Sequence, residues 1–153
     1  MTREGRLSGV KTRTDLALAM TLSLILPGIV LLLGDPLYIG LWYYLAVPTA
    51  ALALGLALRC PPFFLSGSVI AVVLTLATYM LINRHGREGL MVLGHLSSLP
   101  GAGVGLLMAT LASRTRRHPL QCFGLALLGF LSGFLLNQLL ICNSVMWCGP
   151  LSW

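Results

Sequence analysis

The chain has 153 residues, of which 57% are hydrophobic and only 9% are charged, and its mean hydropathy is +0.89. A soluble domain usually carries about 25% charged residues, whereas here ten basic and four acidic side chains would have to serve the whole surface. This composition excludes a soluble enzyme, a disordered segment and a nucleic-acid-binding module, so the net charge of +6 is interpreted as a signal of membrane topology.

The sequence predicts an all-α fold, a polytopic integral membrane bundle of five transmembrane helices. A helix needs about 20 mainly apolar residues to cross about 30 Å of hydrocarbon, and each of five segments of suitable length lacks Asp, Glu, Lys and Arg. The predicted helices are 16–33, 37–58, 63–82, 90–112 and 120–141. A basic segment, 1–15, precedes the predicted bundle, 16–141, and a short tail, 142–153, follows it.

The first predicted helix begins like a signal peptide, because basic residues precede an apolar run. The run is 18 residues long, however, and it continues into Gly34, Asp35 and Pro36 without a small-x-small cleavage pattern. We therefore expect segment 16–33 to remain in the protein as its first membrane-spanning helix.

The basic residues are distributed unequally between the connecting segments. Short cytoplasmic loops retain Lys and Arg, and a cytoplasmic N-terminus places eight basic residues inside, namely Arg3, Arg6, Lys11, Arg13, Arg59, Arg114, Arg116 and Arg117, and two outside, Arg84 and Arg87. We expect a protein of the bacterial inner (plasma) membrane with an extracytoplasmic C-terminus. Tyr38, Trp42, Tyr43 and Tyr44 are expected to anchor the outer end of the second helix in the membrane interface.

The fourth predicted helix, 90–112, is the least regular, because Ser97, Ser98, Pro100 and Gly101 interrupt its apolar pattern. The alternative is four spans plus a re-entrant segment. That topology would divide the basic residues five against five between the two sides, so five spans agree better with the charge distribution.

Pro100 has no backbone N–H and is expected to disturb the fourth helix. One hypothesis is a kink at which the hydroxyls of Ser97 and Ser98 satisfy the freed polar groups. The other is a helix broken at Pro100 and Gly101 that lines a cavity or binds an ion, as in transporters.

Small residues recur at four-residue spacing in three predicted helices. Such residues let helices approach closely in a membrane. They are Gly101, Gly105 and Ala109; Gly129 and Gly133, continued by Asn137; and Gly67, Ala71 and Thr75. These stripes predict either packing inside the chain's own bundle or docking of another membrane protein or a second copy of the chain.

Among the Asp, Glu, Lys, Arg and His residues, only His95 falls within the predicted spans. Intramembrane ionisable residues often mark a functional site, so His95, with Ser98 and Pro100, forms the candidate polar site. A hydrogen-bonded packing role, with Ser98 or Asn137 as the partner, is the other interpretation. The four carboxylates lie outside the spans or at their boundaries, which argues against proton-coupled exporters, carboxylate-based pumps and aspartyl proteases.

We expect no catalytic residue, no metal site and no cofactor. Ser97 and Ser98 follow His95 closely, but no acid is in reach to orient a nucleophile–base pair. The three histidines fall at different depths of the predicted topology and cannot converge on one metal. Cys60 and Cys122 are expected to be reduced structural thiols, because two thiols and one histidine make at most a weak metal site.

Cys142 and Cys148 form the candidate disulfide. Both follow the fifth predicted helix on its extracytoplasmic side, where an oxidising compartment permits a bond, and five residues separate them. Free thiols are the alternative, and the spacing differs from that of thiol oxidoreductases.

Two functional classes remain. The first is a small non-enzymatic membrane protein that acts through contacts, as an accessory or assembly subunit of a membrane complex or as an immunity-type binder of a membrane-acting toxin; its expected partners are the bilayer and another membrane protein or a second copy. The second is a minimal oligomeric channel or transporter that uses the helix break and His95. Arg114, Arg116 and Arg117 are expected to fix the topology, and such a basic loop can also attract anionic lipid.

Overall fold

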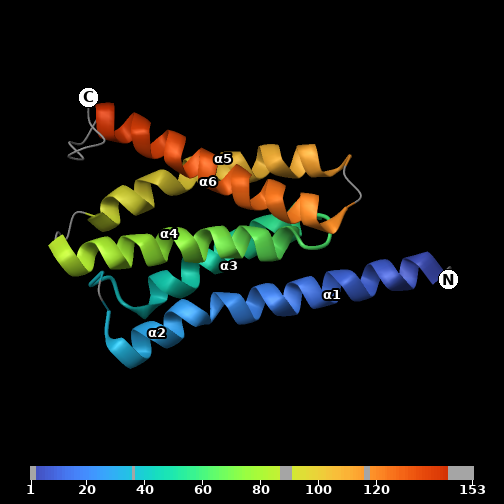
Figure 1. Cartoon of the computed structure of the whole chain (residues 1–153), viewed down its shortest axis with the longest axis horizontal. Helices are drawn as coiled ribbons and strands as arrows, with labels where there is room; N and C mark the ends of the chain where they lie inside the picture. The colour runs from blue at the N-terminus through green and yellow to red at the C-terminus, as the bar shows by residue number, and fades with distance from the viewer. Residues whose placement is uncertain (1–2, 36, 87–90, 116–117, 145–153) are drawn as a thin grey trace.

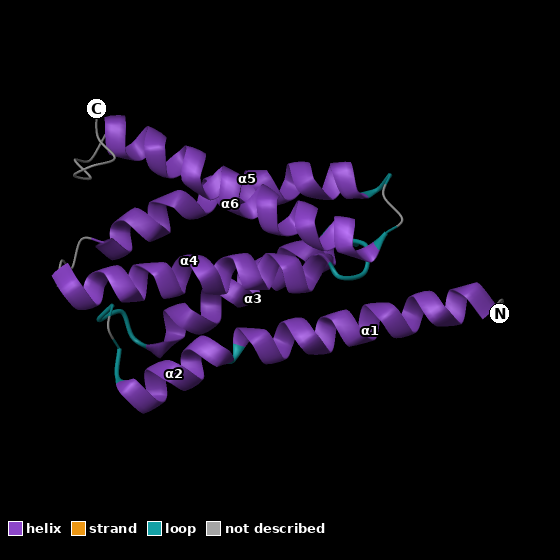
Figure 2. Cartoon of the chain, in the orientation of Figure 1, coloured by secondary structure: helices purple, strands orange, loops and turns teal. Residues whose placement is uncertain are grey.

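The structure is a computed structural model that describes residues 3–35, 37–86, 91–115 and 118–144, without the side chains of residues 3–11, 84–86 and 91. Its described part is built from helices joined by short connections (Figure 2). They are α1 (Arg3–Ser23), α2 (Ile25–Leu33), α3 (Leu41–Ala57), α4 (Phe64–Gly86), α5 (Met91–Ser113) and α6 (Pro119–Ser144). The all-α class predicted from the sequence is confirmed.

Four helical stretches are long and apolar enough to cross a membrane, and they are Thr12–Leu33, Phe64–Asn83, Val92–Ser113 and Pro119–Ser144. The second predicted span, 37–58, corresponds to α3, which is apolar but has 17 residues. At 1.5 Å per residue this helix is about 26 Å long, slightly less than the hydrocarbon core. The chain is an integral membrane protein with a helical bundle.

The first predicted helix is longer than expected and is divided in two. Helix α1 begins at Arg3 within the predicted basic segment, and a turn at Leu24 separates it from α2. Pro27 explains the division, because it has no N–H to donate to the carbonyl of Ser23 one turn earlier. The N-terminal half of α1 extends past the ends of the other helices (Figure 1).

Helix α4 lies in the middle of the bundle, with α1 and α3 against it on one side and α6 on the other (Figure 1). Its central side chains are completely enclosed, since Val69, Ala71, Val72 and Leu76 have no exposed surface. Helix α5 packs mainly along α6. Leucines cover the outer faces of α5 and α6, as expected for surfaces that face lipid.

Helix α5 is continuous through Ser97, Ser98 and Pro100 (Figure 1). The two expectations of an interrupted fourth segment, a re-entrant loop or a helix broken at Pro100 and Gly101, are therefore wrong. A single proline removes only one helical hydrogen bond, and the other backbone bonds and the packing of α5 along α6 keep the helix continuous.

The connection between α2 and α3 is organised by Asp35. Its carboxylate accepts hydrogen bonds from the backbone amides of Leu37 (3.0 Å) and Gly40 (2.6 Å) and from the hydroxyl of Tyr44 (2.7 Å). Gly40 begins α3 with a φ of 84°, a conformation that glycine adopts at little cost. These contacts explain why α3 begins at Leu41 and not at residue 37 as predicted.

Candidate functional site

The candidate polar site around His95 lies inside the bundle, where α3, α4, α5 and α6 meet. His95 is 1% exposed. Its Nδ1 lies 2.8 Å from the hydroxyl oxygen of Tyr43, and its Nε2 lies 3.4 Å from the hydroxyl oxygen of Thr75. Because the Thr75 hydroxyl donates to the carbonyl of Val72 at 2.9 Å, it accepts from Nε2–H, and Nδ1 then accepts from Tyr43.

Aromatic rings enclose the imidazole of His95. The rings of Tyr79 and Phe134 have centroids 5.0 Å and 5.1 Å from it, and the ring of Tyr43 lies edge-on at 5.8 Å. These contacts join α3, α4 and α6 to α5. The site is therefore a closed hydrogen-bonded core that links four helices.

The expected partners of His95, Ser98 and Asn137, make other contacts, so that expectation is wrong. Ser98 hydrogen-bonds the side-chain oxygen of Gln138 on α6, and Asn137 donates to the backbone carbonyl of Ser97 at 2.6 Å. Three residues correspond to a rotation about 60° short of a full turn, so Ser98 meets Gln138 of α6, whereas the nitrogens of His95 meet Tyr43 of α3 and Thr75 of α4.

The same contacts lie beside Pro100 but do not reach the carbonyl that the proline frees. Pro100 cannot donate to the carbonyl of Leu96, whereas Asn137 donates to the carbonyl of Ser97. The hydroxyls of Ser97 and Ser98 lie 3.0 Å and 2.9 Å from the carbonyl oxygen of Gly94. The hypothesis that these hydroxyls satisfy the freed carbonyl is therefore wrong.

Tyr43 is a residue of the site that the sequence analysis assigned to a different role. Tyr43 and Tyr44 were expected as interface anchors, yet they are 2% and 0% exposed, so this expectation is wrong for both. Tyr38 and Trp42 are exposed and remain suited to anchoring. The sequence signal that distinguishes them is helical spacing, since Tyr43 is one turn from Val47, which is also buried.

The two glycine stripes of α5 and α6 face each other. A Cβ atom added at Gly101 would lie 2.5 Å from the carbonyl oxygen of Gly133, and one added at Gly129 would lie 2.6 Å from the Cβ of Ala109 and 2.7 Å from the carbonyl oxygen of Gly105. Backbones therefore touch along this line, which only small residues permit. The stripe residues Gly101, Gly105, Ala109, Gly129, Gly133 and Asn137 pack inside the bundle.

The third stripe, on α4, also faces α6. A Cβ added at Gly67 would lie 2.5 Å from the carbonyl oxygen of Phe123, Ala71 is fully buried, and Thr75 belongs to the His95 site. The three stripes thus fix α4, α5 and α6 to one another.

Asp15 is a buried carboxylate that the sequence analysis did not expect inside the bundle. It is 1% exposed and accepts hydrogen bonds from the backbone amides of Leu65 (3.3 Å) and Ser66 (3.0 Å) and from the hydroxyl of Ser66. A carboxylate at this position satisfies free amides of the first turn of α4 and faces the positive end of the helix dipole. Asp15 therefore attaches α1 to the beginning of α4.

The cysteines occupy two separate regions. Cys60 and Cys122 form no disulfide, and the thiol of Cys60 lies 3.4 Å from the hydroxyl oxygen of Thr110. Cys142 is buried and disulfide-bonded. Cys148 lies outside the described residues, so its pairing with Cys142 stays a prediction.

The topology-determining cluster is described only in part. Arg114 is exposed directly after α5, whereas Arg116 and Arg117 lie outside the described residues. Within the described ranges, no three His, Cys, Asp or Glu side chains gather in a way that could hold a metal ion.

No family model, no curated protein and no solved structure matches the chain. The proposed function therefore rests on the geometry of this chain alone.

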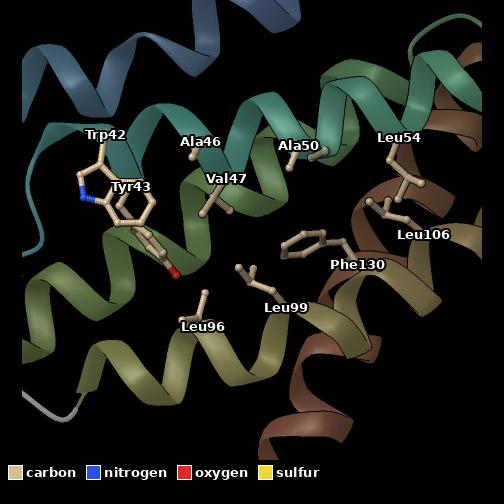
Figure 3. A pocket seen from close by; sticks show the side chains of 12 residues that line it. Trp42, Tyr43, Ala46, Val47, Ala50, Leu54, Leu96, Leu99, Leu106 and Phe130 are labelled. Carbon is tan, nitrogen blue, oxygen red and sulfur yellow. The ribbon is translucent and has the colours of Figure 1, made fainter.

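A groove of about 310 Å³ opens between α3 and α5 (Figure 3). Trp42 lies at one end, Leu54 and Leu106 lie at the other, and Phe130 of α6 reaches into it from behind. Its walls are almost wholly apolar, and Ala46, Ala50 and Gly103 make it wide. Tyr43 lines the groove, but its hydroxyl is hydrogen-bonded to His95 and therefore gives the groove no available polar group.

Proposed function

We propose that the protein is a non-enzymatic membrane protein that acts through contacts within the bilayer. It serves as an accessory or assembly subunit of a membrane complex or as an immunity-type binder of a membrane-acting toxin. Its proposed place is the bacterial inner membrane, with the N-terminus in the cytoplasm and the C-terminus outside.

This proposal rests on the observation that the polar groups inside the bundle are hydrogen-bonded to one another. Every buried side-chain nitrogen or oxygen in the described part of the chain has a hydrogen-bond partner. His95, Ser98 and Asn137 each bond to a neighbouring helix, and Asp15 bonds to the beginning of α4. These groups hold the helices of the bundle together. A protein that presents its surface to a partner needs such a rigid bundle.

The opposing hypothesis, an oligomeric channel or transporter, requires polar groups that face a water-filled path. The candidate polar site is His95, and the rings of Tyr79 and Phe134 lie against its imidazole. Beyond His95 along α5, closely packed glycines bring the backbones of α5 and α6 into contact. Both observations favour a contact protein.

The first experiment places a photo-crosslinking amino acid at lipid-facing positions in native membranes. Leu128 and Leu135 represent α6, and Val104 and Leu111 represent α5; all four are more than half exposed. A contact protein should give protein adducts of one defined mass from one helix face. After identification of the partner, a crosslinker in the partner should give the same adduct.

The second experiment separates the two functional classes. Purified protein is reconstituted in liposomes, and the flux of ions and small solutes is measured for the parent chain and for His95→Gln. We expect no flux above that of empty liposomes. A flux that depends on pH and disappears in the variant, together with no protein adduct from any crosslinking position, would replace the contact function by transport.

A further inference from the structure

The groove between α3 and α5 has the dimensions of a lipid chain. Trp42 and Leu54 line it 12 residues apart on α3, which corresponds to about 18 Å along the helix. One leaflet contributes about 15 Å to a hydrocarbon core of about 30 Å. The groove can therefore accommodate an acyl chain lying along the bundle.

Two arginines lie where the two walls of the groove end. Arg59 follows the end of α3, and Arg114 follows the end of α5. The contact between Cys60 and Thr110 holds these two helix ends together. Cys60 directly follows Arg59, and Thr110 is four residues before Arg114, so both exposed arginines lie at the same end of the bundle, beyond Leu54 and Leu106 of the groove. We call this end of the bundle the basic end.

The basic end keeps a net positive charge among the described residues. Asp15 lies there as well, with its oxygens bonded to the amides of Leu65 and Ser66, but its single negative charge offsets at most one of the two arginines. Burial raises the pKa of the Cys60 thiol overall, while the hydrogen bond with Thr110 and the charge of Arg114 oppose this rise. Arg114 therefore lies near Cys60, at the same end of the bundle as Arg59.

We propose that the groove and the basic end together bind one anionic phospholipid. The acyl chain lies between α3 and α5, and Arg59 and Arg114 bind the phosphate. Guanidinium groups form paired hydrogen bonds to phosphate oxygens, and an apolar groove that leads to two cations fits an anionic amphiphile. An apolar partner helix could fill the groove, but it would bring no negative charge to pair with the arginines. A neutral lipid likewise lacks the negative charge that the arginines favour. This binding goes beyond the contact function and does not depend on it.

The test is native mass spectrometry of the purified full chain, titrated separately with phosphatidylglycerol and phosphatidylcholine that carry the same acyl chains. We expect selective binding of phosphatidylglycerol. Removal of both cations by Arg59→Asn with Arg114→Gln should weaken its binding roughly thirtyfold, because each basic residue near a lipid surface contributes about a fivefold factor. Asn is chosen for position 59 because the residue has a φ of 51°, which Asn adopts more readily than Gln.

Matched variants distinguish lipid binding at this site from general electrostatic attraction between the lipid and the protein surface. Arg13→Gln removes one charge from an exposed residue of α1 that lies toward the same end of the bundle but does not line the groove, and it should leave the affinity nearly unchanged. Ala50→Leu fills the groove and should weaken binding, whereas Ala53→Leu adds the same volume on another face of α3 and should not. Helix content by circular dichroism establishes that each variant folds.

Three results would overturn the proposal. An equal loss for Arg13→Gln and Arg114→Gln would mean diffuse attraction by surface charge. Unchanged binding in Ala50→Leu would mean that no chain enters the groove. A photo-crosslinker at Ala50 that captures a protein in native membranes, and no lipid, would mean that a partner helix occupies the groove.

Discussion

His95 illustrates how one polar residue is accommodated within the bilayer. Its two ring nitrogens contact Tyr43 and Thr75, and Tyr79 and Phe134 cover its ring. An unsatisfied polar group in hydrocarbon costs several kcal/mol, so such a residue is tolerated only when partners from other helices are positioned for it. Its burial indicates a cohesive role for this histidine.

His95→Leu should destabilise the bundle by about 1–3 kcal/mol, because the hydroxyl of Tyr43 would lose its acceptor while remaining buried. His95→Gln retains an acceptor and should cost less. The measurement is denaturant unfolding in detergent micelles. If both variants unfold at the same denaturant concentration as the parent, the hydrogen bonds at this site contribute nothing to stability.

Asp35 predicts a dependence of stability on pH. Burial by itself raises the pKa of this carboxyl, but the hydrogen bonds from Tyr44 and from the amides of Gly40, Leu37 and Ile39 lower it by more in total, and its net pKa is below the ordinary value of 3.8. A carboxyl with a lowered pKa stabilises the fold above its unfolded pKa, and this contribution is lost as the pH falls through the folded pKa.

The parent should therefore lose stability between about pH 4 and more acidic values, and Asp35→Asn should show a smaller loss in the same range. Thermal unfolding in micelles at a series of pH values provides the measurement. Equal losses in parent and variant would assign the acid sensitivity to other groups.

At the scale of elements, two devices hold the helices together. Asp15 of α1 bonds the first amides of α4, and the glycines of α5 and α6 bring two backbones into contact. The first device depends on a charge at the positive end of a helix, and the second depends on the absence of side chains. Together they connect the N-terminal helix to the C-terminal pair through α4.

Removal of the cap by Asp15→Ala should destabilise the protein by about 0.5–2 kcal/mol, the usual cost of losing a helix N-cap. Asp15→Asn keeps one acceptor oxygen and should cost less. Denaturant unfolding monitored by circular dichroism gives both values. An Asn variant that is less stable than the Ala variant would contradict the capping role.

Gly133→Leu should separate α5 from α6, because even a Cβ at this position would lie 3.0 Å from the Cα of Gly105. Gly124→Leu is a matched control on the same helix, since a Cβ there meets nothing within 4 Å. It is better matched than Leu131→Ala, because Leu131 packs against the core. Cysteine crosslinking between the two helices reports their separation, and equal crosslinking in both leucine variants would contradict the close packing.

At the scale of the whole molecule, charge and apolar surface are segregated. Arg13, Arg59 and Arg114 lie toward the basic end, and Asp35 lies in the connection at the opposite end of α3. Retention of basic residues in the cytoplasm then predicts the orientation. The exposed leucines of α5 and α6 lie between the two ends and face the hydrocarbon.

A reporter fused after Trp153 should behave as extracytoplasmic, and a reporter inserted after Arg114 should behave as cytoplasmic. Alkaline phosphatase and green fluorescent protein fusions measure the two locations. A cytoplasmic location for the C-terminal fusion would remove one span from the topology, with α3 the first candidate because of its 17 residues.

The sequence by itself determined the class of the protein and the approximate positions of its helices. Mean hydropathy, the length of the apolar segments and the lack of charges within them are local properties, and they depend only on the thickness of the bilayer. The glycine spacing on α5 and α6 was visible for the same reason, because residues four apart share a helix face.

Only the tertiary structure decided which residues meet. The pairing of His95 with Tyr43 spans 52 positions, and that of Asp15 with Ser66 spans 51, so no periodicity within one helix predicts either. The contact of Asn137 with the carbonyl of Ser97, beside Pro100, likewise joins residues 40 positions apart on two helices. The groove between α3 and α5 arises from the spacing of these helices, which is fixed by the packing of α3 on α4 and of α5 on α6 and not by the composition of either one.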